Sequence, residues 1–368
     1  MSITRIAACH AAPIFLSARA TTEKAISLIH QAAKNNAHLV VFPETYISAF
    51  PIWSALRPPT ENHSLFERMV SESIYADGEE IGSIRAAAKE ATILVSMGFS
   101  EKSRFSTATL WNSNILIDKD GSVLNHHRKL VPTFFEKLTW SPGDGHGLKV
   151  SHTEHGNIGN LICGENTNPL ARYTLMAQAE QIHISTWPAI WPTRVPAETG
   201  SSESGAGAES NYDNVAANRT RAVAHCFEAK CFGILCAGYL DDYAIEIVTA
   251  GSSSPDVVRG ALQRSPRGAS MFLDPTGAAH PAFTFSASGE KVDTESLQHE
   301  EGILYADFEL DRCVEGKQYH DVVGGYQRLD VFTLQVNRER KDPVIFKNAI
   351  SENEGEKKVE KTREILEV

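Results

Sequence analysis

The stretch Asn160-Leu-Ile-Cys-Gly-Glu-Asn-Thr-Asn-Pro-Leu170 places one cysteine, Cys163, between a short apolar run and a polar segment that can start a helix. This pattern predicts a buried strand, then a turn, then a helix with Pro169 in its first turn. Cys163 would stand at the carboxyl end of the strand, the edge of an α/β sheet that faces the ligand crevice. The amides of the helix start would there favour a thiolate over a thiol. The alternative is a core cysteine without chemistry, since free cysteine is among the most buried residue types.

Two other apolar runs end in charged side chains of opposite sign. Residues 39–44, Leu-Val-Val-Phe-Pro-Glu, end in Glu44, and residues 125–132, Asn-His-His-Arg-Lys-Leu-Val-Pro, carry Lys129 just after a strand-like stretch. A carboxylate, an ammonium and a thiol at three strand ends supply a general base, a clamp for developing negative charge and a nucleophile. Taken singly, Glu44 is better explained as a solvated loop acid and Lys129 as a surface lysine in a basic cluster.

Taken together, these segments resemble those of the nitrilase superfamily of carbon–nitrogen hydrolases, and more narrowly its nitrilase branch. Residues 42–44 are similar to the segment that bears the catalytic glutamate of that family, 127–130 to its lysine segment and 163–166 to its nucleophile segment. Glu136 matches a second glutamate that the family carries near the active site. The likeness runs from about residue 4 to about residue 335, and the order Glu, Lys, Glu, Cys is the family's own.

The nucleophile segment also narrows the resemblance. Cys-Gly-Glu-Asn-Thr-Asn-Pro-Leu-Ala-Arg, from Cys163 onward, and His-Ile-Ser-Thr-Trp-Pro at 183–188 are most similar to fungal and bacterial nitrilases that act on arylaceto- and aromatic nitriles. Many relatives have tryptophan directly after the cysteine, where this chain has Gly164, which changes the pocket wall. Many also have Gly-His-Tyr where this chain has Gly324-Gly325-Tyr326, which leaves the role of that late segment open.

The resemblance implies a nitrilase that needs no metal or cofactor and converts an organic nitrile, expected to be arylaceto- or aromatic, into the carboxylic acid and ammonia. Glu44 would take the thiol proton, and Cys163 would attack the nitrile carbon to give a thioimidate and later a thioester. Lys129 would stabilise developing charge, and Glu136 would orient it or share proton handling. Some amide by-product is expected, because the tetrahedral intermediate can expel the thiolate instead of ammonia.

The expected substrate contacts rest on a weaker pattern. On the family pattern, the aromatic stretch after residue 186 borders the substrate, where ring faces can stack on an aryl group. The same stretch could equally pack a loop against the core. The residues expected to border the substrate are Gly164, Trp187 and Pro188.

Several other functions remain open from the sequence. The same three central residues serve relatives that hydrate cyanide or cleave amides and N-carbamoyl groups. A papain-like cysteine peptidase would need a histidine paired with Cys163, whereas the motif carries glutamate and lysine. A protein of another class, a catalytically silent one that keeps the fold to form filaments, is disfavoured by the intact Glu44, Lys129 and Cys163.

Composition excludes some partners and locations. A formal net charge of -11 argues against nucleic acid or an anionic membrane, since both call for a basic face. No run of about 18 apolar residues occurs, which argues against a transmembrane helix. The first residues imitate a signal peptide, but His10 and Pro13 interrupt the apolar region. The six cysteines lack the paired spacing of metal or redox sites and are too sparse for a disulfide scaffold, so we expect a reducing compartment and a cytoplasmic protein. The cysteines at 226, 231 and 236 are expected in the core.

Alternating apolar patterns predict an α/β fold, and the resemblance makes it an αββα two-sheet sandwich. We expect a single catalytic domain over residues 1–345 and a charged tail over 346–368 that is flexible or contacts the oligomer. A small, polar, glycine-rich loop over 197–210 is expected to be a passive surface loop, with a pocket lid or a subunit contact as the alternatives. The resemblance also implies a homo-oligomer with a dimer building block, which could extend to a helical filament. The expected strands are 3–10, 38–43, 92–99, 109–117, 122–128, 181–186, 232–239 and 302–309, and the helices 20–35, 79–91, 169–180 and 213–230.

Overall fold

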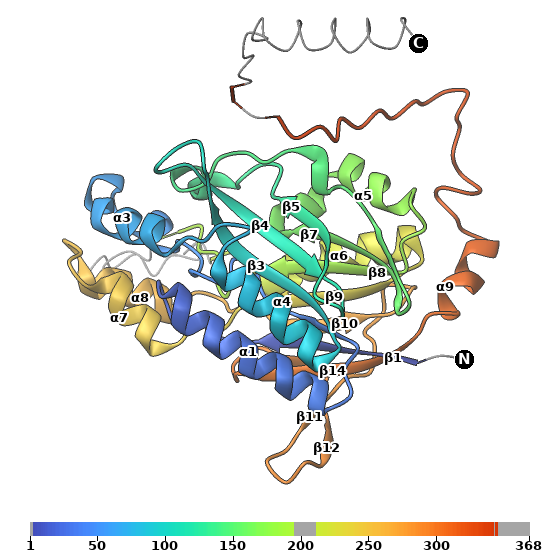
Figure 1. Cartoon of the computed structure of the whole chain (residues 1–368), viewed down its shortest axis with the longest axis horizontal. Coiled ribbons are helices and arrows are strands. Elements are labelled where there is room, and N and C mark those ends of the chain that lie inside the picture. The colour runs from blue at the N-terminus through green and yellow to red at the C-terminus, as the bar shows by residue number, and fades with distance from the viewer. Residues whose placement is uncertain (1–2, 195–210, 342, 345–368) are drawn as a thin grey trace, which may run out of the picture.

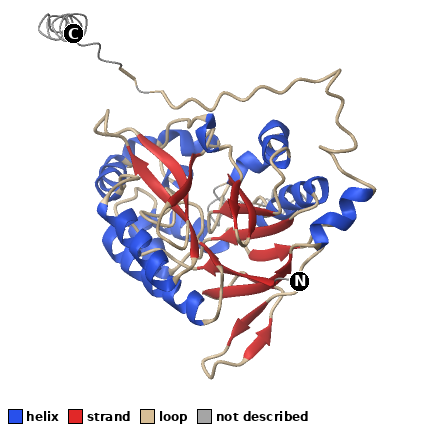
Figure 2. Ribbon diagram, turned by 45° about the vertical axis from the view of Figure 1, so that its right-hand side comes forward, coloured by secondary structure: helices blue, strands red, loops and turns tan. Residues whose placement is uncertain are grey.

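Two β-sheets pack face to face between outer layers of helices, as the two views in Figures 1 and 2 show. The computed structural model describes residues 3–194, 211–341, 343 and 344. The first sheet runs in the order β12 (Lys291–Asp293), β11 (Phe283–Phe285), β14 (Gly302–Glu309), β1 (Ile3–His10), β2 (Leu39–Val41), β3 (Leu94–Lys102), β4 (Leu110–Ile117), β5 (Val123–Arg128). The second runs β13 (Ser296–Leu297), β10 (Ser270–Leu273), β9 (Phe232–Ala237), β8 (Ile182–Trp187), β7 (Gly156–Ile162), β6 (Ser151–Thr153).

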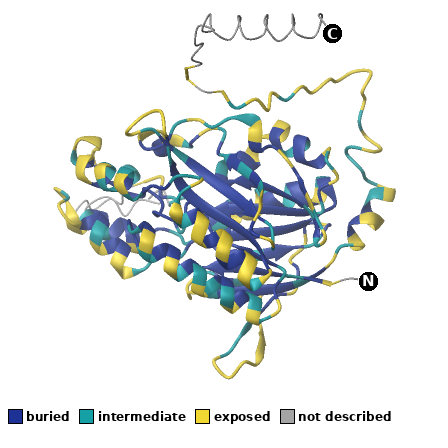
Figure 3. Cartoon of the chain, in the orientation of Figure 1, coloured by how far each residue is buried: buried dark blue, intermediate teal, exposed yellow. Residues whose placement is uncertain are grey.

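The layers follow from the two-residue period of the strands. In β1, Ile6 and Ala8 point between the sheets and pack with Phe232 and Phe308, whereas Ala7 packs on the helical side. Helices α1 (Ala18–Lys34) and α4 (Glu79–Ala91) cover the first sheet, and α5 (Pro169–Met176) and α6 (Asn214–Ala229) lie on the second. Burial is concentrated in the strands, and the outward helix faces are exposed (Figure 3). Successive side chains on opposite faces therefore fill two kinds of core, as an αββα sandwich requires.

Parallel strands in both sheets bring several chain segments to one edge. β1, β2 and β3 are parallel neighbours in the first sheet, and β7, β8 and β9 in the second. The segments that follow β2 and β7 therefore leave their sheets at carboxyl ends, where open α/β sheets place their sites.

The structure confirms the αββα sandwich and the predicted elements, with α4 and β14 at the predicted bounds. The helix predicted over 169–180 ends earlier, at Met176, because the chain turns through a left-handed conformation at Ala179. Helices in segments left unassigned by the sequence pack together in a third apolar cluster beside the sheets. These are α2 (Trp53–Leu56), α3 (His63–Glu72), α7 (Asp242–Thr249) and α8 (Pro255–Arg264); the short α9 (Arg312–Glu315) follows β14.

Some expectations fall on parts of the chain that the structure does not describe. The loop over 197–210 and the tail over 346–368 lie outside the described residues, so the expected domain limits stay predictions. Among the described helices, none is long and apolar enough to span a bilayer.

Gly98 in β3 allows the close approach of the loop that follows β2. A Cβ atom at this position would lie 2.2 Å from the carbonyl oxygen of Pro43 and 2.8 Å from the amide nitrogen of Thr45. We expect Gly98→Ala to lower the free energy of unfolding by about 1–3 kcal/mol, because overpacking forces backbone shifts. Gly82, exposed in α4, has open space around its Cβ position, so Gly82→Ala should raise it by about 0.5–1 kcal/mol. Denaturant unfolding of both variants measures this, and equal effects would contradict the steric argument.

Candidate active site

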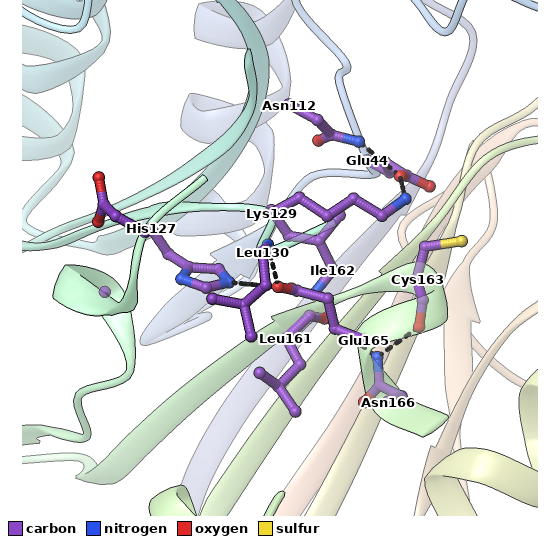
Figure 4. A network of polar contacts seen from close by, with 12 residues as sticks. Glu44, Asn112, His127, Lys129, Leu130, Leu161, Ile162, Cys163, Glu165 and Asn166 are labelled. Atoms are coloured by element: carbon purple, nitrogen blue, oxygen red, sulfur yellow. Dashed lines mark hydrogen bonds and ion pairs between the residues drawn. The ribbon is translucent and has the colours of Figure 1, made fainter. Parts of the chain in front are cut away.

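Three strand ends bring a carboxylate, an ammonium and a thiol together. Glu44 follows β2, Lys129 follows β5 and Cys163 follows β7 (Figure 4). Lys129 Nζ donates hydrogen bonds to Glu44 Oε1 at 2.8 Å and to Glu136 Oε2 at 2.6 Å. A carboxylate oxygen from each glutamate and the sulfur of Cys163 lie within 4.8 Å of one another. All four side chains are buried, so one ammonium is held between two carboxylates beside a thiol.

Glu136 lies in a short 3₁₀ helix, Phe134–Leu138, that directly follows the lysine segment. Its Oε2 also accepts a hydrogen bond from the backbone amide of Thr133 at 3.0 Å, and its Oε1 accepts one from Trp191 Nε1 at 3.3 Å. These contacts hold the carboxylate in place against Lys129.

Cys163 occupies a left-handed backbone conformation with φ of 51°. It is the first residue of the 3₁₀ helix Cys163–Thr167, directly after β7. Non-glycine residues in this region are strained and persist only where surrounding contacts hold them, which is common at reacting groups. The sharp strand-to-helix turn presents the side chain at the sheet edge, as in a nucleophile elbow.

Burial and neighbouring charges set the protonation of the cluster. Burial, together with the charge of Glu44, raises the pKa of the Cys163 thiol well above its usual value. Burial raises the pKa of Glu44 to about 7, against the opposing effect of Lys129. Burial alone would lower the pKa of Lys129, but the facing Cys163, Glu136 and Glu44 outweigh it and raise that pKa well above its usual value. The resting cluster thus holds a thiol beside a carboxylate that titrates near neutrality.

The predicted preference for a thiolate is therefore wrong. The α-helix that was expected to stabilise it, α5, begins only at Pro169, and Cys163 is buried. Burial disfavours the charged form of a thiol, so an acceptor must remove its proton as it reacts.

Glu44 is positioned to be that acceptor. Its Oε1 receives hydrogen bonds from both Lys129 and Asn112, the latter at 2.7 Å from Nδ2. Its buried Oε2 has no hydrogen-bond partner among the described residues. One oxygen is thus held in place while the other is free to accept a proton.

Cys163 opens onto a recess of about 310 Å³. The predicted substrate neighbours Gly164, Trp187 and Pro188 all line it, together with Trp191. A larger apolar recess of about 460 Å³ includes Glu44 but not Cys163. Because an attacked carbon must reach the sulfur, the recess that contains Cys163 is the candidate substrate site.

Comparisons with known proteins place the chain in a family. A model described as carbon–nitrogen hydrolase matches residues 5–318. The chain belongs to the carbon–nitrogen hydrolase family. An arylacetonitrilase from Hypocrea virens is 33% identical over 93% of this chain and 94% of its own, and a nitrilase from Penicillium rubens is 31% identical over 93% and 95%. The structure of Saccharomyces cerevisiae Nit3, a member of branch 10 of the nitrilase superfamily, covers 90% of this chain and 97% of its own at 17% identity with a TM-score of 0.60.

As a carbon–nitrogen hydrolase, this protein hydrolyses carbon–nitrogen bonds. The resemblance drawn from the sequence motifs is confirmed at the level of the family and fold.

The structure explains why residue 164 is a glycine. A Cβ atom there would lie 2.6 Å from Thr133 Oγ1, so the Thr133 side chain occupies part of the space that a larger residue would need. Thr133 itself lines the recess. The other departure from the family pattern, Gly325, lies in a turn closed by its amide on the carbonyl of Asp321, with Tyr326 exposed. Neither Gly325 nor Tyr326 lines the recess with Cys163.

Several residues of this carbon–nitrogen hydrolase site were missed by sequence reasoning. Besides Asn112, helix α6 and the residues before it bring polar side chains to the recess. Three of these side chains are spaced four and three residues apart, so they share one face of the helix, and this spacing is visible in the helix predicted over 213–230. The four residues are Tyr212, Asn214, Asn218 and Arg221.

Glu165 ties the lysine segment to the nucleophile segment. Its Oε1 accepts from the amide of Leu130 at 2.5 Å, and its Oε2 accepts from the amide of Ile162 at 2.8 Å. His127 Nε2 also lies 2.9 Å from Oε2. One buried carboxylate thus holds the residue after Lys129 and the residue before Cys163 in fixed relation (Figure 4).

A second network of buried hydrogen bonds holds the turn at Cys163 in place. Asn166 Nδ2 donates to the carbonyls of Leu161 at 3.2 Å and Cys163 at 3.0 Å, which turns its Oδ1 toward His183 Nε2 at 2.8 Å. His183 Nδ1 lies 2.8 Å from one oxygen of Glu180. The elbow carbonyl is therefore connected through an amide and an imidazole to a fully buried carboxylate.

The other oxygen of Glu180 binds His225. His225 Nε2 lies 2.6 Å from it, and the rings of His183 and His225 stack with centroids 3.6 Å apart. Burial would raise the pKa of Glu180, but His225 and His183 lower it to about 2. Burial and the charge of His183 lower the pKa of His225 to about 4. Glu180 is thus ionised and His225 neutral at physiological pH.

Two groups of side chains have the spacing of metal ligands. They are Glu44, Glu136 and Cys163, and Glu180, His183 and His225. In the first, the positive charge between the carboxylates is the ammonium of Lys129. In the second, each carboxylate oxygen is engaged by an imidazole nitrogen. Hydrogen bonding within the chain accounts for both groups.

We expect His225 to make stability depend on pH. Its folded pKa of about 4 lies below the usual value of 6.5, so between these values the unfolded chain binds a proton that the folded chain does not. Stability should fall from pH 6.5 to 4.5 by roughly 2–3 kcal/mol more in the wild type than in His225→Asn. Denaturant unfolding at both pH values measures this, with His63→Asn, at an exposed position of α3, as the control for removing a histidine. Equal pH dependence in His225→Asn and the wild type would contradict it.

Proposed function

We propose that the chain is a nitrilase that hydrolyses an arylaceto- or aromatic nitrile to the carboxylic acid and ammonia. The observation that carries the proposal is the contact of Lys129 with both Glu44 and Glu136 beside Cys163. The names of the arylacetonitrilase and nitrilase relatives support nitriles over other carbon–nitrogen substrates. Aromatic side chains at the recess, among them Trp187 and Trp191, offer faces on which an aryl ring can stack.

In the first step, the free oxygen of Glu44 takes the proton of the Cys163 thiol as the sulfur bonds to the nitrile carbon. Glu44 passes this proton to the nitrile nitrogen, which gives a thioimidate and restores the carboxylate. Lys129 stabilises the negative charge that develops on nitrogen during the attack. A thiol with a raised pKa needs a base at the moment of attack, and a carboxylate with a pKa of about 7 suits that task near neutral pH.

Hydrolysis of the thioimidate uses the same groups. Glu44 removes a proton from water as it adds to the thioimidate carbon, and the tetrahedral intermediate expels ammonia to leave a thioester. A second water releases the carboxylic acid and restores the thiol. Expulsion of the thiolate from the first intermediate releases an amide instead. Glu136, held by Thr133 and Trp191, keeps the ammonium of Lys129 in place throughout.

Amide and N-carbamoyl hydrolysis or cyanide hydration remain the alternatives within the family. Each would use the same nucleophile, base and cation. The aromatic rings that line the recess, Trp187, Trp191 and Tyr212, favour an aryl substrate over cyanide. We also propose that the protein forms a homo-oligomer built from dimers.

We expect Cys163→Ala to abolish ammonia release, because no other group at the recess can form the thioimidate. Lys129→Ala should lower kcat by about 10²- to 10³-fold or more, the loss seen when one preorganised donor to a developing anion is removed. Cys313→Ala, which removes a buried thiol outside the recess, is the control. Ammonia release from phenylacetonitrile, benzonitrile, a short aliphatic nitrile and the matching amides, together with formamide formation from cyanide, measures both activity and substrate class. Faster turnover of cyanide or amides, or substantial activity of Cys163→Ala, would refute the proposal.

The pH dependence of kcat/KM should report Glu44. Because its carboxylate form accepts the thiol proton, activity should fall below about pH 7, approaching tenfold per pH unit. Asn112 donates to Glu44 and lowers its pKa, so Asn112→Leu should move the acidic limb to higher pH. Profiles of both enzymes from pH 5 to 9 measure the shift. An acidic limb that stays in place or moves to lower pH in Asn112→Leu would argue against Glu44 as the base.

A further inference from the structure

The recess that contains Cys163 also has a cation that the proposed chemistry does not use. Arg221, in α6, lines this recess. Its Nε donates to Thr167 Oγ1 at 2.7 Å, a neutral partner. Within residues 3–194 and 211–344, so far as the structure describes them, no carboxylate forms an ion pair with its guanidinium. An arginine in a ligand recess without an acidic partner can bind an anion there.

Asn218 provides a second, independent observation. The residue is only 7% exposed, and it lines the same recess one helical turn before Arg221. No hydrogen bond joins its amide group to any residue that the structure describes, whereas the nearby Asn214 donates to the carbonyl of Pro266 at 2.8 Å. Its amide nitrogen and oxygen are open to the recess, where they can donate to and accept from a ligand.

Aromatic rings surround the guanidinium. Its carbon lies 5.8 Å from the ring centroid of Tyr212 and 5.9 Å from that of Trp187. Trp191 packs edge to face against Tyr212 at 5.8 Å. Rings that limit water around a cation strengthen its interaction with an anion, because the local dielectric constant is lower than in bulk water.

We propose that the substrate carries a carboxylate at the end remote from the nitrile, with Arg221 binding that carboxylate and Asn218 donating an amide hydrogen bond to it. The inference rests on the proposed function, since it places the nitrile carbon at Cys163. The two ends of the substrate then occupy one recess, which is lined by α6 on one side and by the segment after β8 on the other. The substrate class is an acidic nitrile.

The test compares acidic and neutral nitriles of the same shape. Carboxylate and nitro groups are both planar and similar in size, but only the first is charged. The pairs are 3- and 4-carboxyphenylacetonitrile with 3- and 4-nitrophenylacetonitrile. We expect kcat/KM of the wild type to favour the acid of at least one pair by tenfold or more, chiefly through KM.

Variants of α6 locate the preference. Arg221→Gln should reduce the ratio of kcat/KM between acid and nitro compound to about one, and Arg221→Lys should keep part of it. Arg219→Gln removes the same charge from an exposed position of the same helix and is the matched control; its ratio should stay that of the wild type. A wild type that turns over the nitro compounds as well as the acids, or an unchanged ratio in Arg221→Gln, would overturn the carboxylate site while leaving the proposed nitrilase activity intact.

A binding measurement separates the two proposals further. Calorimetry of 4-carboxyphenylacetonitrile, and of the 3-isomer, with Cys163→Ala and with Cys163→Ala/Arg221→Gln needs no turnover. We expect at least tenfold weaker binding in the double variant. Such a loss together with no ammonia release from any nitrile by the wild type would refute the proposed function yet support the carboxylate site. Equal binding of the acid by both variants would overturn the carboxylate site.

Discussion

The buried ammonium of Lys129 is the interaction on which the site depends. It satisfies Glu44 and Glu136 at once, and none of the three side chains is exposed to solvent. Removing a charge from water costs several kcal/mol, and a buried carboxylate without its cation would be protonated or would disrupt the fold. With two carboxylates and one cation, full neutralisation is impossible. Burial, with the charge of Glu136 adding to it, raises the pKa of Glu44 to about 7, so the arrangement that stabilises the cluster also leaves one carboxylate ready to exchange a proton.

The fold holds this cluster through contacts between segments that are distant in sequence. Lys129 and Glu44 are 85 residues apart, and their positions depend on the register of β2 and β5, which are separated by β3 and β4 in one sheet. Cys163 comes from the other sheet, and Glu165 joins it to the lysine segment through two backbone amides. Asn166 donates to the carbonyl of Cys163, and His183 links Asn166 to the buried carboxylate of Glu180. Reacting groups are therefore placed on strand ends, and each is fixed by hydrogen bonds of neighbouring residues, which preorganises the site.

The parts of this arrangement that the sequence predicted are those carried by contiguous patterns. Each of Glu44, Lys129 and Cys163 lies within three residues of the end of a strand that the sequence predicts, so their meeting could be predicted, and the structure brings them together. The buried network of Asn166, His183, Glu180 and His225 could not be predicted. Glu180 and His225 are 45 residues apart in the sequence and meet only once α6 lies on the second sheet. The thiolate prediction failed because a motif indicates a neighbouring helix start but not the depth of burial, which dominates the pKa of Cys163. Helices α3, α7 and α8 are short and pack in one apolar cluster beside the sheets. They do not alternate with strands in the sequence, so the pattern of alternating strands and helices did not predict them.

An acidic substrate would meet opposing fields in this protein. The chain carries a net charge of -11, which repels an anion at long range, whereas Arg221 attracts it only inside the recess. At physiological ionic strength, charges more than about 8 Å apart in water are largely screened, so the repulsion acts weakly on the approach. The contact inside the recess is screened less, because aromatic rings flank the guanidinium. Discrimination between acidic and neutral nitriles would then arise from one contact at the end of the recess, and the charge of the surface would mainly keep the protein soluble.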